Sequence, residues 1–347
     1  MKQQILTLGF VLFSLMLPLK AAAQKIEKIY PFGDSLSDSG NLYNATLKFT
    51  GTGYPPSPYF KGRFSNGPVW VEYLGQKLKL NPTPYTSLPL GSSNAPDGIN
   101  YAFGGSSAGY DNALYPKAPL PGLLGQVSLF TVSLAQSKQT ADPDALYIVW
   151  AGANDYLFGK VTDPQVPVKN LLTAVTALVA VGAKNIVVVN LPDLGKLPGT
   201  RLNSQISSQL TALTSAHNSN LAQKVLSLKL YSKANIILLD ANTLFNTFLK
   251  YPGAFGFKNV TNACLTNNTV CANPNQYVFW DNYHPTTAAH KQLGNLAYFV
   301  LKMKSPQSQL TLPPEPRTQI SHPRLAQLVY SDSGLETGNL KDLNYFK

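Results

Sequence analysis

Strand-like runs alternate with helical segments along most of this chain. Runs rich in Ile, Val, Leu and aromatic residues occupy 26–32, 99–103, 144–150, 185–190 and 235–240. Segments with helical patterning occur in 119–136, 169–181 and 204–230. Parallel strands require long crossover connections, usually helices, and strands buried on both faces read as nearly continuous apolar runs. The alternation therefore predicts an α/β domain with a central parallel sheet of about five strands, covered by helices on both faces.

The first strand-like run ends in a stretch rich in Ser, Asp and Gly. Residues 33–41 read Gly-Asp-Ser-Leu-Ser-Asp-Ser-Gly-Asn. Ser35 would lie at the carboxyl end of a buried parallel strand, where open α/β sheets bind their ligands. One interpretation makes Ser35 a nucleophile in a turn held by Asp34 and Asp38. The other is an ordinary turn that caps the next helix.

A second stretch with catalytic residue types lies near the far end of the chain. Asp281 precedes His284 by three positions, and Pro285 is expected to open a closing helix that runs to about Lys302. One turn can therefore present a general base together with the carboxylate that orients it. Two glycine-containing loops, 100–109 and 149–155, each follow a strand-like run between these ends.

These four blocks, in this order, resemble the GDSL lipases and esterases, also called SGNH hydrolases, over roughly residues 27 to 304. The stretch 63–74 is further similar to the bacterial secreted phospholipase, lysophospholipase and haemolysin-like members. The resemblance implies a three-layer α/β/α, flavodoxin-like fold. It also implies a serine nucleophile and an oxyanion hole at named positions.

The site that the resemblance implies has five members. Ser35 would attack the ester carbonyl, His284 would accept its proton, and Asp281 would orient the imidazole. The oxyanion would be held by the backbone N–H groups of Ser35 and Gly105 and by the side-chain amide of Asn154. Asn154 also has a plain interpretation as a turn residue. The histidines at 217, 290 and 322 are expected to be packing or surface residues.

The implied activity is hydrolysis of carboxylic esters of lipids, with phospholipid or lysophospholipid as the expected substrate. Acyl transfer to an alcohol is a further activity that an acyl-enzyme permits. The alternatives are a carbohydrate acetyl esterase and a non-catalytic lipid- or surface-binding module. The sequence contains no glycine-rich phosphate loop and no metal-ligand motif, so it implies no cofactor.

The two ends of the chain differ in composition from the middle. Lys2, the apolar run 5–19 and the small residues before Gln24 are typical of a cleavable signal peptide over 1–23. We therefore expect a secreted or periplasmic protein with a hydrolase domain over 24–304. Five prolines interrupt the following residues, which predicts a C-terminal extension over 305–347.

Two cysteines, Cys264 and Cys271, lie in the loop that leads to Asp281. Export to an oxidising compartment favours a disulfide between them. Two unpaired thiols are the alternative. A metal site has less support, because no His or Cys pair at zinc spacing accompanies them.

The chain is basic, with a net charge of +11 that becomes +9 without Lys2 and Lys20. Such a charge favours transient contact with anionic membrane surfaces, although it also serves ordinary solubility. The Lys and Arg residues are dispersed and form no run interleaved with aromatic residues, which argues against nucleic acid as a partner. The oligomeric state is left open.

Two further stretches follow residues 33–41, which we call the serine block. Residues 42–62 are rich in Gly, Pro and Tyr, which predicts a loop beside the nucleophile that lines a substrate cleft. The next residues predict a helix opened by Pro68 and capped by Ser65 or Asn66.

Overall fold

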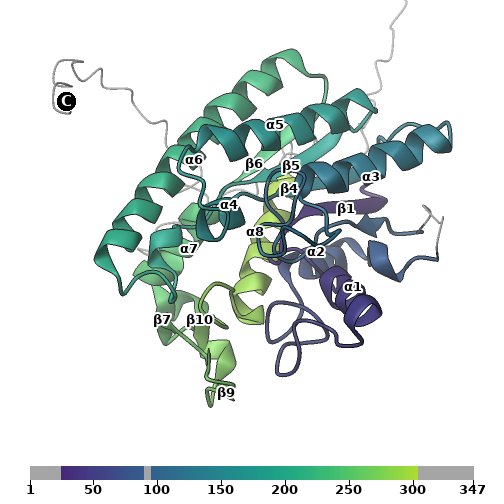
Figure 1. Ribbon diagram of the computed structural model, residues 1–347. Helices are drawn as coiled ribbons and strands as arrows, with labels where there is room; N and C mark the ends of the chain where they lie inside the picture. The colour runs from purple at the N-terminus through teal and green to yellow at the C-terminus, as the bar shows by residue number, and fades with distance from the viewer. Residues whose placement is uncertain (1–24, 90–94, 304–347) are drawn as a thin grey trace, which may run out of the picture.

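A four-stranded parallel sheet forms the centre of the computed structural model, which describes residues 25–89 and 95–303 (Figure 1). Its strands, in spatial order, are β1 (Lys28–Gly33), β4 (Ala145–Trp150), β5 (Asn185–Val189) and β6 (Asn235–Leu239). The predicted signal peptide (1–23) and C-terminal extension (305–347) lie outside the described residues. The four longest strand-like runs of the sequence thus supply the four strands.

The fifth expected strand is shorter than its sequence pattern indicates. β3 (Ile99–Asn100) pairs with β2 (Thr83–Pro84) instead of joining the main ladder. The segment around β3 nevertheless runs alongside β1, because the two exchange backbone hydrogen bonds at three points. These bonds are Ile29 N–H to Asp97 O (2.9 Å), Tyr101 N–H to Pro31 O (2.8 Å) and Phe103 N–H to Gly33 O (3.1 Å). The segment therefore forms an irregular outer edge of the sheet.

Helices cover both faces of the sheet, as the alternation predicts (Figure 1). One face packs against α2 (Trp70–Leu78), α7 (Ala241–Lys250) and α8 (Thr287–Met303). The opposite face packs against α3 (Leu123–Gln136), α5 (Gln165–Ala180) and α6 (Ser204–Tyr231). Successive side chains of a strand point to opposite faces. In β4, Ile148 accordingly joins the first core cluster and Tyr147 the second. The fold is a three-layer α/β/α sandwich.

Smaller elements lie in the connections between the main strands and helices. The short helical segments are α4 (Ala153–Leu157), η1 (Tyr85–Ser87), η2 (Leu194–Lys196), η3 (Pro252–Phe255) and η4 (Pro274–Gln276). The short strands are β7 (Asn259–Ala263), β8 (Leu265–Thr266), β9 (Thr269–Val270) and β10 (Tyr277–Phe279). Cys264 and Cys271 form a disulfide across the β8–β9 hairpin, as expected. Among the described residues, no helix is both long and apolar enough to span a bilayer.

The loop predicted for residues 42–62 is wrong in its first part. Residues 41–50 form the helix α1 (Asn41–Thr50), which buries Leu42 and Ala45 on one side. The glycines and prolines that favour a loop begin only at Gly51, where the left-handed backbone (φ +74°) ends the helix. Loop structure is correct from that point onward.

Two predicted helix starts also differ from the structure. α2 begins at Trp70 instead of Pro68, and Ser65 and Asn66 make no cap for it. α8 begins at Thr287 instead of Pro285, because Pro285 still pairs with Phe279 in an isolated bridge. In both cases long-range contacts hold the residues that local patterning assigns to the first helical turn.

Gly33 gives a direct test of how β1 delivers the segment that follows it. A Cβ at this position would overlap the carbonyl oxygen of Trp150 on the neighbouring strand. We expect Gly33→Ala to lower the free energy of unfolding by about 1–3 kcal/mol or more, because neither strand can move inside the sheet. Urea denaturation measures the loss. Gly253→Ala is the matched control, since a Cβ there meets nothing within 4 Å, and an equal loss in both variants would contradict the prediction.

Candidate active site

Ser35 lies in a tight turn directly after β1. The side chain of Gln126, which is fully buried on α3, bonds both backbone groups of Gly33: its Oε1 accepts from the N–H and its Nε2 donates to the carbonyl, each at 2.8 Å. Within the turn, the Asp34 carboxylate accepts the N–H of Leu36 at 3.0 Å. The end of the strand and the turn are therefore fixed on both sides of Ser35.

Asp38 extends this framework to α1 and to the glycine-containing loop 100–109. Its buried carboxylate accepts backbone N–H groups from Gly40 (2.7 Å), Asn41 (2.5 Å) and Leu42 (3.0 Å), at the start of α1. It also accepts the N–H of Gly104 at 2.8 Å. The serine block thus caps a helix, as the plain interpretation predicts, and it also carries Ser35 to the edge of the sheet.

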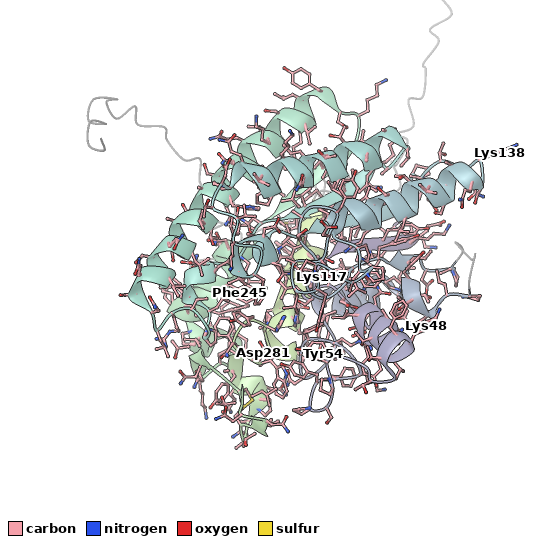
Figure 2. The ribbon with its side chains drawn as sticks, viewed as in Figure 1. Lys48, Tyr54, Lys117, Lys138, Phe245 and Asp281 are labelled. Atoms are coloured by element: carbon pink, nitrogen blue, oxygen red, sulfur yellow. A yellow bond between two sulfur atoms is a disulfide. The ribbon has the colours of Figure 1, made fainter. Side chains whose placement is uncertain are left out.

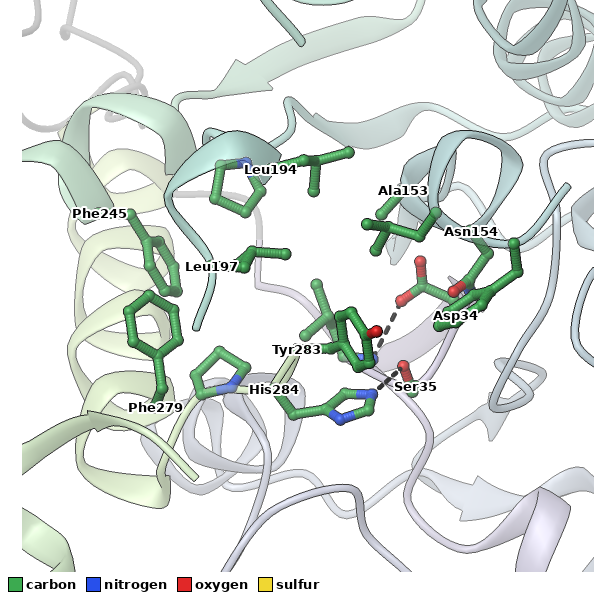
Figure 3. Close-up of a pocket in the computed structure, with 15 residues that line it drawn as sticks. Asp34, Ser35, Ala153, Asn154, Leu194, Leu197, Phe245, Phe279, Tyr283 and His284 are labelled. Carbon is green, nitrogen blue, oxygen red and sulfur yellow. Dashed lines mark hydrogen bonds between the residues drawn. The ribbon is translucent and has the colours of Figure 1, made fainter. Parts of the chain in front are cut away.

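Ser35, His284 and Asp281 form one hydrogen-bonded chain. The Nε2 of His284 lies 2.9 Å from the Oγ of Ser35 (Figure 3). Its Nδ1 lies 2.9 and 2.8 Å from the two carboxylate oxygens of Asp281. Asp281 also accepts the N–H groups of Tyr283 and His284 at 2.8 Å each, and the hydroxyl of Tyr59 at 2.7 Å. The structure therefore joins residues that are 249 positions apart.

Electrostatic interactions keep Asp281 ionised at the end of this series of hydrogen bonds. Burial alone would raise the pKa of Asp281, but His284 and the donors around the carboxylate outweigh burial and lower it below its usual value. An ionised Asp281 favours the proton on the Nδ1 of His284, which leaves Nε2 free to accept the proton of Ser35. This arrangement can activate a serine hydroxyl for attack on a carbonyl carbon.

The expected oxyanion donors lie around the serine turn. The backbone N–H groups of Ser35 and Gly105 donate to no acceptor in the part of the chain that the structure describes. Gly105 has φ +79°, a conformation that favours glycine, and a Cβ there would lie 2.6 Å from Asn112 Oδ1. The amide of Asn154 donates one bond to Ser106 O (2.9 Å), and the side chain lines the pocket beside Ser35.

Asp155 joins two of the glycine-containing blocks. Its carboxylate accepts the N–H of Ala108 at 2.8 Å, next to the bond that Asn154 donates to Ser106. Burial raises the pKa of Asp155 to about 6 and that of Asp34 to about 7. Each of these carboxyls is already bonded to a backbone N–H, so both belong to the framework of the site.

A pocket with mainly apolar walls opens from Ser35 and His284. Its free volume is about 490 Å³, part of it open to solvent. Ten apolar side chains line it: Leu36, Ala153, Leu157, Phe158, Pro192, Leu194, Leu197, Phe245, Phe279 and Pro285. Figure 3 shows Phe245 and Phe279 at the end away from Ser35, with Leu194 and Leu197 along the way. Figure 2 locates Phe245 and Asp281 on the whole domain.

Sequence reasoning missed several residues that shape the site. Tyr59 and Gln126 lie in no recognisable motif, yet one bonds Asp281 and the other fixes Gly33. Leu194 and Leu197 follow β5, and Phe245 lies on α7, which follows β6. The rule that ligands bind outside the carboxyl ends of parallel strands points to both connections. Within the described residues, no group of three or more His, Cys, Asp or Glu side chains is placed to hold a metal ion.

His217 supports the segment that carries Asn154. It is buried on α6, lies 2.9 Å from the Tyr156 hydroxyl through Nδ1, and contacts Gly152 so closely that a Cβ there would be 2.9 Å from its Cε1. The Nε2 has no hydrogen-bond partner among the described residues. Burial lowers the pKa of His217 to about 4. The expectation that it is a packing residue agrees with this environment.

Comparison with known proteins gives a consistent picture. Residues 29–297 match the family model described as GDSL-like Lipase/Acylhydrolase. The thermolabile hemolysin of Vibrio parahaemolyticus is 31% identical, over 77% of this chain and 62% of the relative. The phosphatidylcholine-sterol acyltransferase of Aeromonas hydrophila is 33% identical, over 70% of this chain and 67% of the relative. The GDSL esterase/lipase 5 of Arabidopsis thaliana is 24% identical, over 79% and 82%.

The depressed pKa of His217 predicts a specific dependence of stability on pH. The neutral ring contributes its full stability above the unfolded pKa of about 6.5, and this contribution is lost as the pH falls towards 4. We therefore expect the stability difference between wild type and His217→Gln to move in favour of the variant by about 2–3 kcal/mol between pH 7 and pH 4. Urea denaturation at several pH values measures it, and parallel pH profiles would show that His217 is not buried as a neutral ring.

Proposed function

Because the chain belongs to the GDSL-like lipase/acylhydrolase family, we propose that it is a serine carboxylic ester hydrolase acting on phospholipids or lysophospholipids. One observation carries this proposal: the hydrogen-bonded chain of Ser35, His284 and Asp281 opens onto an apolar pocket. The chain spans 62% of the length of the hemolysin relative.

The chemistry follows from the positions of the donors and acceptors. The Oγ of Ser35 attacks the ester carbonyl carbon while its proton passes to the Nε2 of His284, and Asp281 stabilises the resulting imidazolium. The oxyanion is held by the N–H groups of Ser35 and Gly105 and by the amide of Asn154. His284 then gives its proton to the leaving alcohol, and an acyl-enzyme remains.

Deacylation repeats these roles with a second nucleophile. Water loses its proton to His284, attacks the acyl carbonyl, and releases the carboxylic acid and Ser35. Another alcohol can take the place of water, in which case the acyl group is transferred to it. The acyltransferase named among the relatives supports this second outcome as an additional activity of the site.

The pocket favours an acyl chain over an acetyl group. Burial of each methylene contributes about 0.8 kcal/mol of binding free energy, so an apolar wall from Leu197 to Phe245 favours binding of a long acyl chain. An acetyl group on a sugar would leave that wall uncovered. The names of the hemolysin and phosphatidylcholine-sterol acyltransferase relatives also support lipid esters.

We further propose that the protein is exported and makes transient contact with membranes. The signal-like residues 1–23 and the Cys264–Cys271 disulfide support an oxidising destination outside the cytoplasm. The net charge of +9 that remains without Lys2 and Lys20 supports attraction to anionic lipid surfaces.

Ser35→Ala tests the proposed chemistry and the substrate class together. We expect the wild type to release fatty acid from lysophosphatidylcholine and the variant to lose that activity by about 10³-fold or more, because only the nucleophile is removed. Acetate release from an acetylated sugar is measured beside it. Acetate without fatty acid would indicate a carbohydrate esterase, and activity that survives in Ser35→Ala would exclude Ser35 as the nucleophile.

Leu197→Gln tests whether the pocket binds the acyl chain. We expect the ratio of kcat/KM for decanoyl over acetyl p-nitrophenyl esters to fall by about 10-fold, because a buried amide without a partner disfavours apolar contact. Leu202→Gln is the matched control, since this leucine of the same connection is 85% exposed. A Leu197→Gln variant with the wild-type ratio would place the acyl chain elsewhere.

A further inference from the structure

The segment around residues 59–66 lies against the turn that carries Asp281 and His284. Three side chains of this segment bond to it in register. These bonds are the Tyr59 hydroxyl to Asp281 Oδ2 (2.7 Å), Ser65 Oγ to Pro285 O (2.9 Å) and Thr287 N–H to Asn66 Oδ1 (2.8 Å). Tyr59 is the one member of this set that contacts the charged carboxylate. Its hydroxyl therefore touches the hydrogen-bonded chain that ends at Ser35.

Aromatic packing fixes the ring of Tyr59 against the site. Its ring centroid lies 6.0 Å from Trp280 and 6.2 Å from Phe64, both in edge-to-face geometry. Phe64 in turn lies 5.0 Å from the imidazole of His284. Such edge-to-face pairs hold rings in defined orientations. The Tyr59 hydroxyl is thus directed at Asp281 by the same aromatic group that packs on His284.

The backbone that carries Tyr59 is also anchored. Gly53 and Gly62 pass so close to the ring of Tyr43 on α1 that a Cβ at either position would overlap it. At the far end of the loop, Arg63 forms a 2.8 Å ion pair with Glu72 on α2. The loop from 51 to 63 is therefore held at both ends by helices.

The donors divide unequally between the two oxygens of Asp281. Oδ1 accepts the backbone N–H groups of Tyr283 and His284. Oδ2 accepts the Tyr59 hydroxyl, and both oxygens lie within bonding distance of His284 Nδ1. Without Tyr59, Oδ2 would have the imidazole as its one partner among the described residues. A carboxylate that loses a donor holds a neighbouring proton more strongly.

We propose that Tyr59 is a positioning residue for catalysis. It extends the series of hydrogen bonds to Tyr59, Asp281, His284 and Ser35, and its bond to Asp281 weakens the attraction of that carboxylate for the imidazolium proton. This inference rests on the proposed ester hydrolysis. Burial, together with the negative charge of Asp281, raises the pKa of Tyr59 above its usual value. The hydroxyl therefore stays protonated and remains a donor over the range in which an imidazole titrates.

Tyr59→Phe tests the proposal on p-nitrophenyl butyrate, because it removes the hydroxyl and keeps the ring. We expect kcat to fall by about 5-fold with KM within about 2-fold, because the lost bond involves a charged group. We also expect the acid limb of the kcat/KM profile to move to higher pH. Without the bond from Tyr59, the Asp281 carboxylate attracts the proton on His284 more strongly, so this proton is lost only at higher pH. An acid limb at the wild-type pH would overturn the proposal.

Tyr73→Phe is the matched control. The Tyr73 hydroxyl bonds Thr287 Oγ1 at 2.7 Å, next to the same catalytic turn but away from Asp281. A purely structural role would change melting temperature and activity in both variants without moving either pH profile. Only the Tyr59 variant is expected to show the shift.

A double variant separates action through Asp281 from direct action. In the Asp281→Asn background, Tyr59→Phe is expected to cause no further loss, whereas an additive loss would overturn the proposal. Ser35→Ala, assayed on the same ester, distinguishes the two levels of failure. Activity in that variant would defeat the proposed function, while an inactive Ser35→Ala with an unshifted Tyr59→Phe profile would defeat the positioning role alone.

Discussion

The carboxylate of Asp38 is the interaction on which the geometry of the site depends. It is buried, which raises its pKa, and four backbone N–H groups stabilise its charged form. Three of these donors open α1 and the fourth belongs to Gly104. One side chain therefore holds the two backbone segments that carry Ser35 and Gly105, whose N–H groups have no acceptor among the described residues. In the proposed reaction, donors fixed in this way need no reorganisation when the oxyanion forms.

The fold could be predicted, and the segments that carry Ser35, Asp281 and His284 could be singled out, because their signals are local. Continuous apolar runs mark β4 and β5, and the spacing of Asp281 and His284 fits a single turn. Local reasoning failed at Ser65 and Asn66, whose side chains have the chemistry of helix caps but bond residues about 220 positions away. Competition between a nearby and a distant partner is decided by tertiary packing.

The walls of the site were beyond prediction for a related reason. Tyr59, Leu197 and Phe245 are ordinary residues of a loop, a strand-to-helix connection and a helix. Leu197 and Phe245 line the pocket that opens from Ser35 because the order of the strands brings the ends of β5 and β6 to the side of β4 opposite β1. A sequence pattern gives the type of each element and not the neighbours it will have.

The junction between residues 59–66 and the turn at 281–287 has a consequence for the order in which the protein matures. Ser35 is synthesised early, but His284 lies 249 positions later and is held beside it by the packing of α8 against α2. Until His284 is in place, the serine hydroxyl has no acceptor for its proton. Under the proposed function, a partly synthesised chain that lacks His284 is therefore unable to hydrolyse an ester.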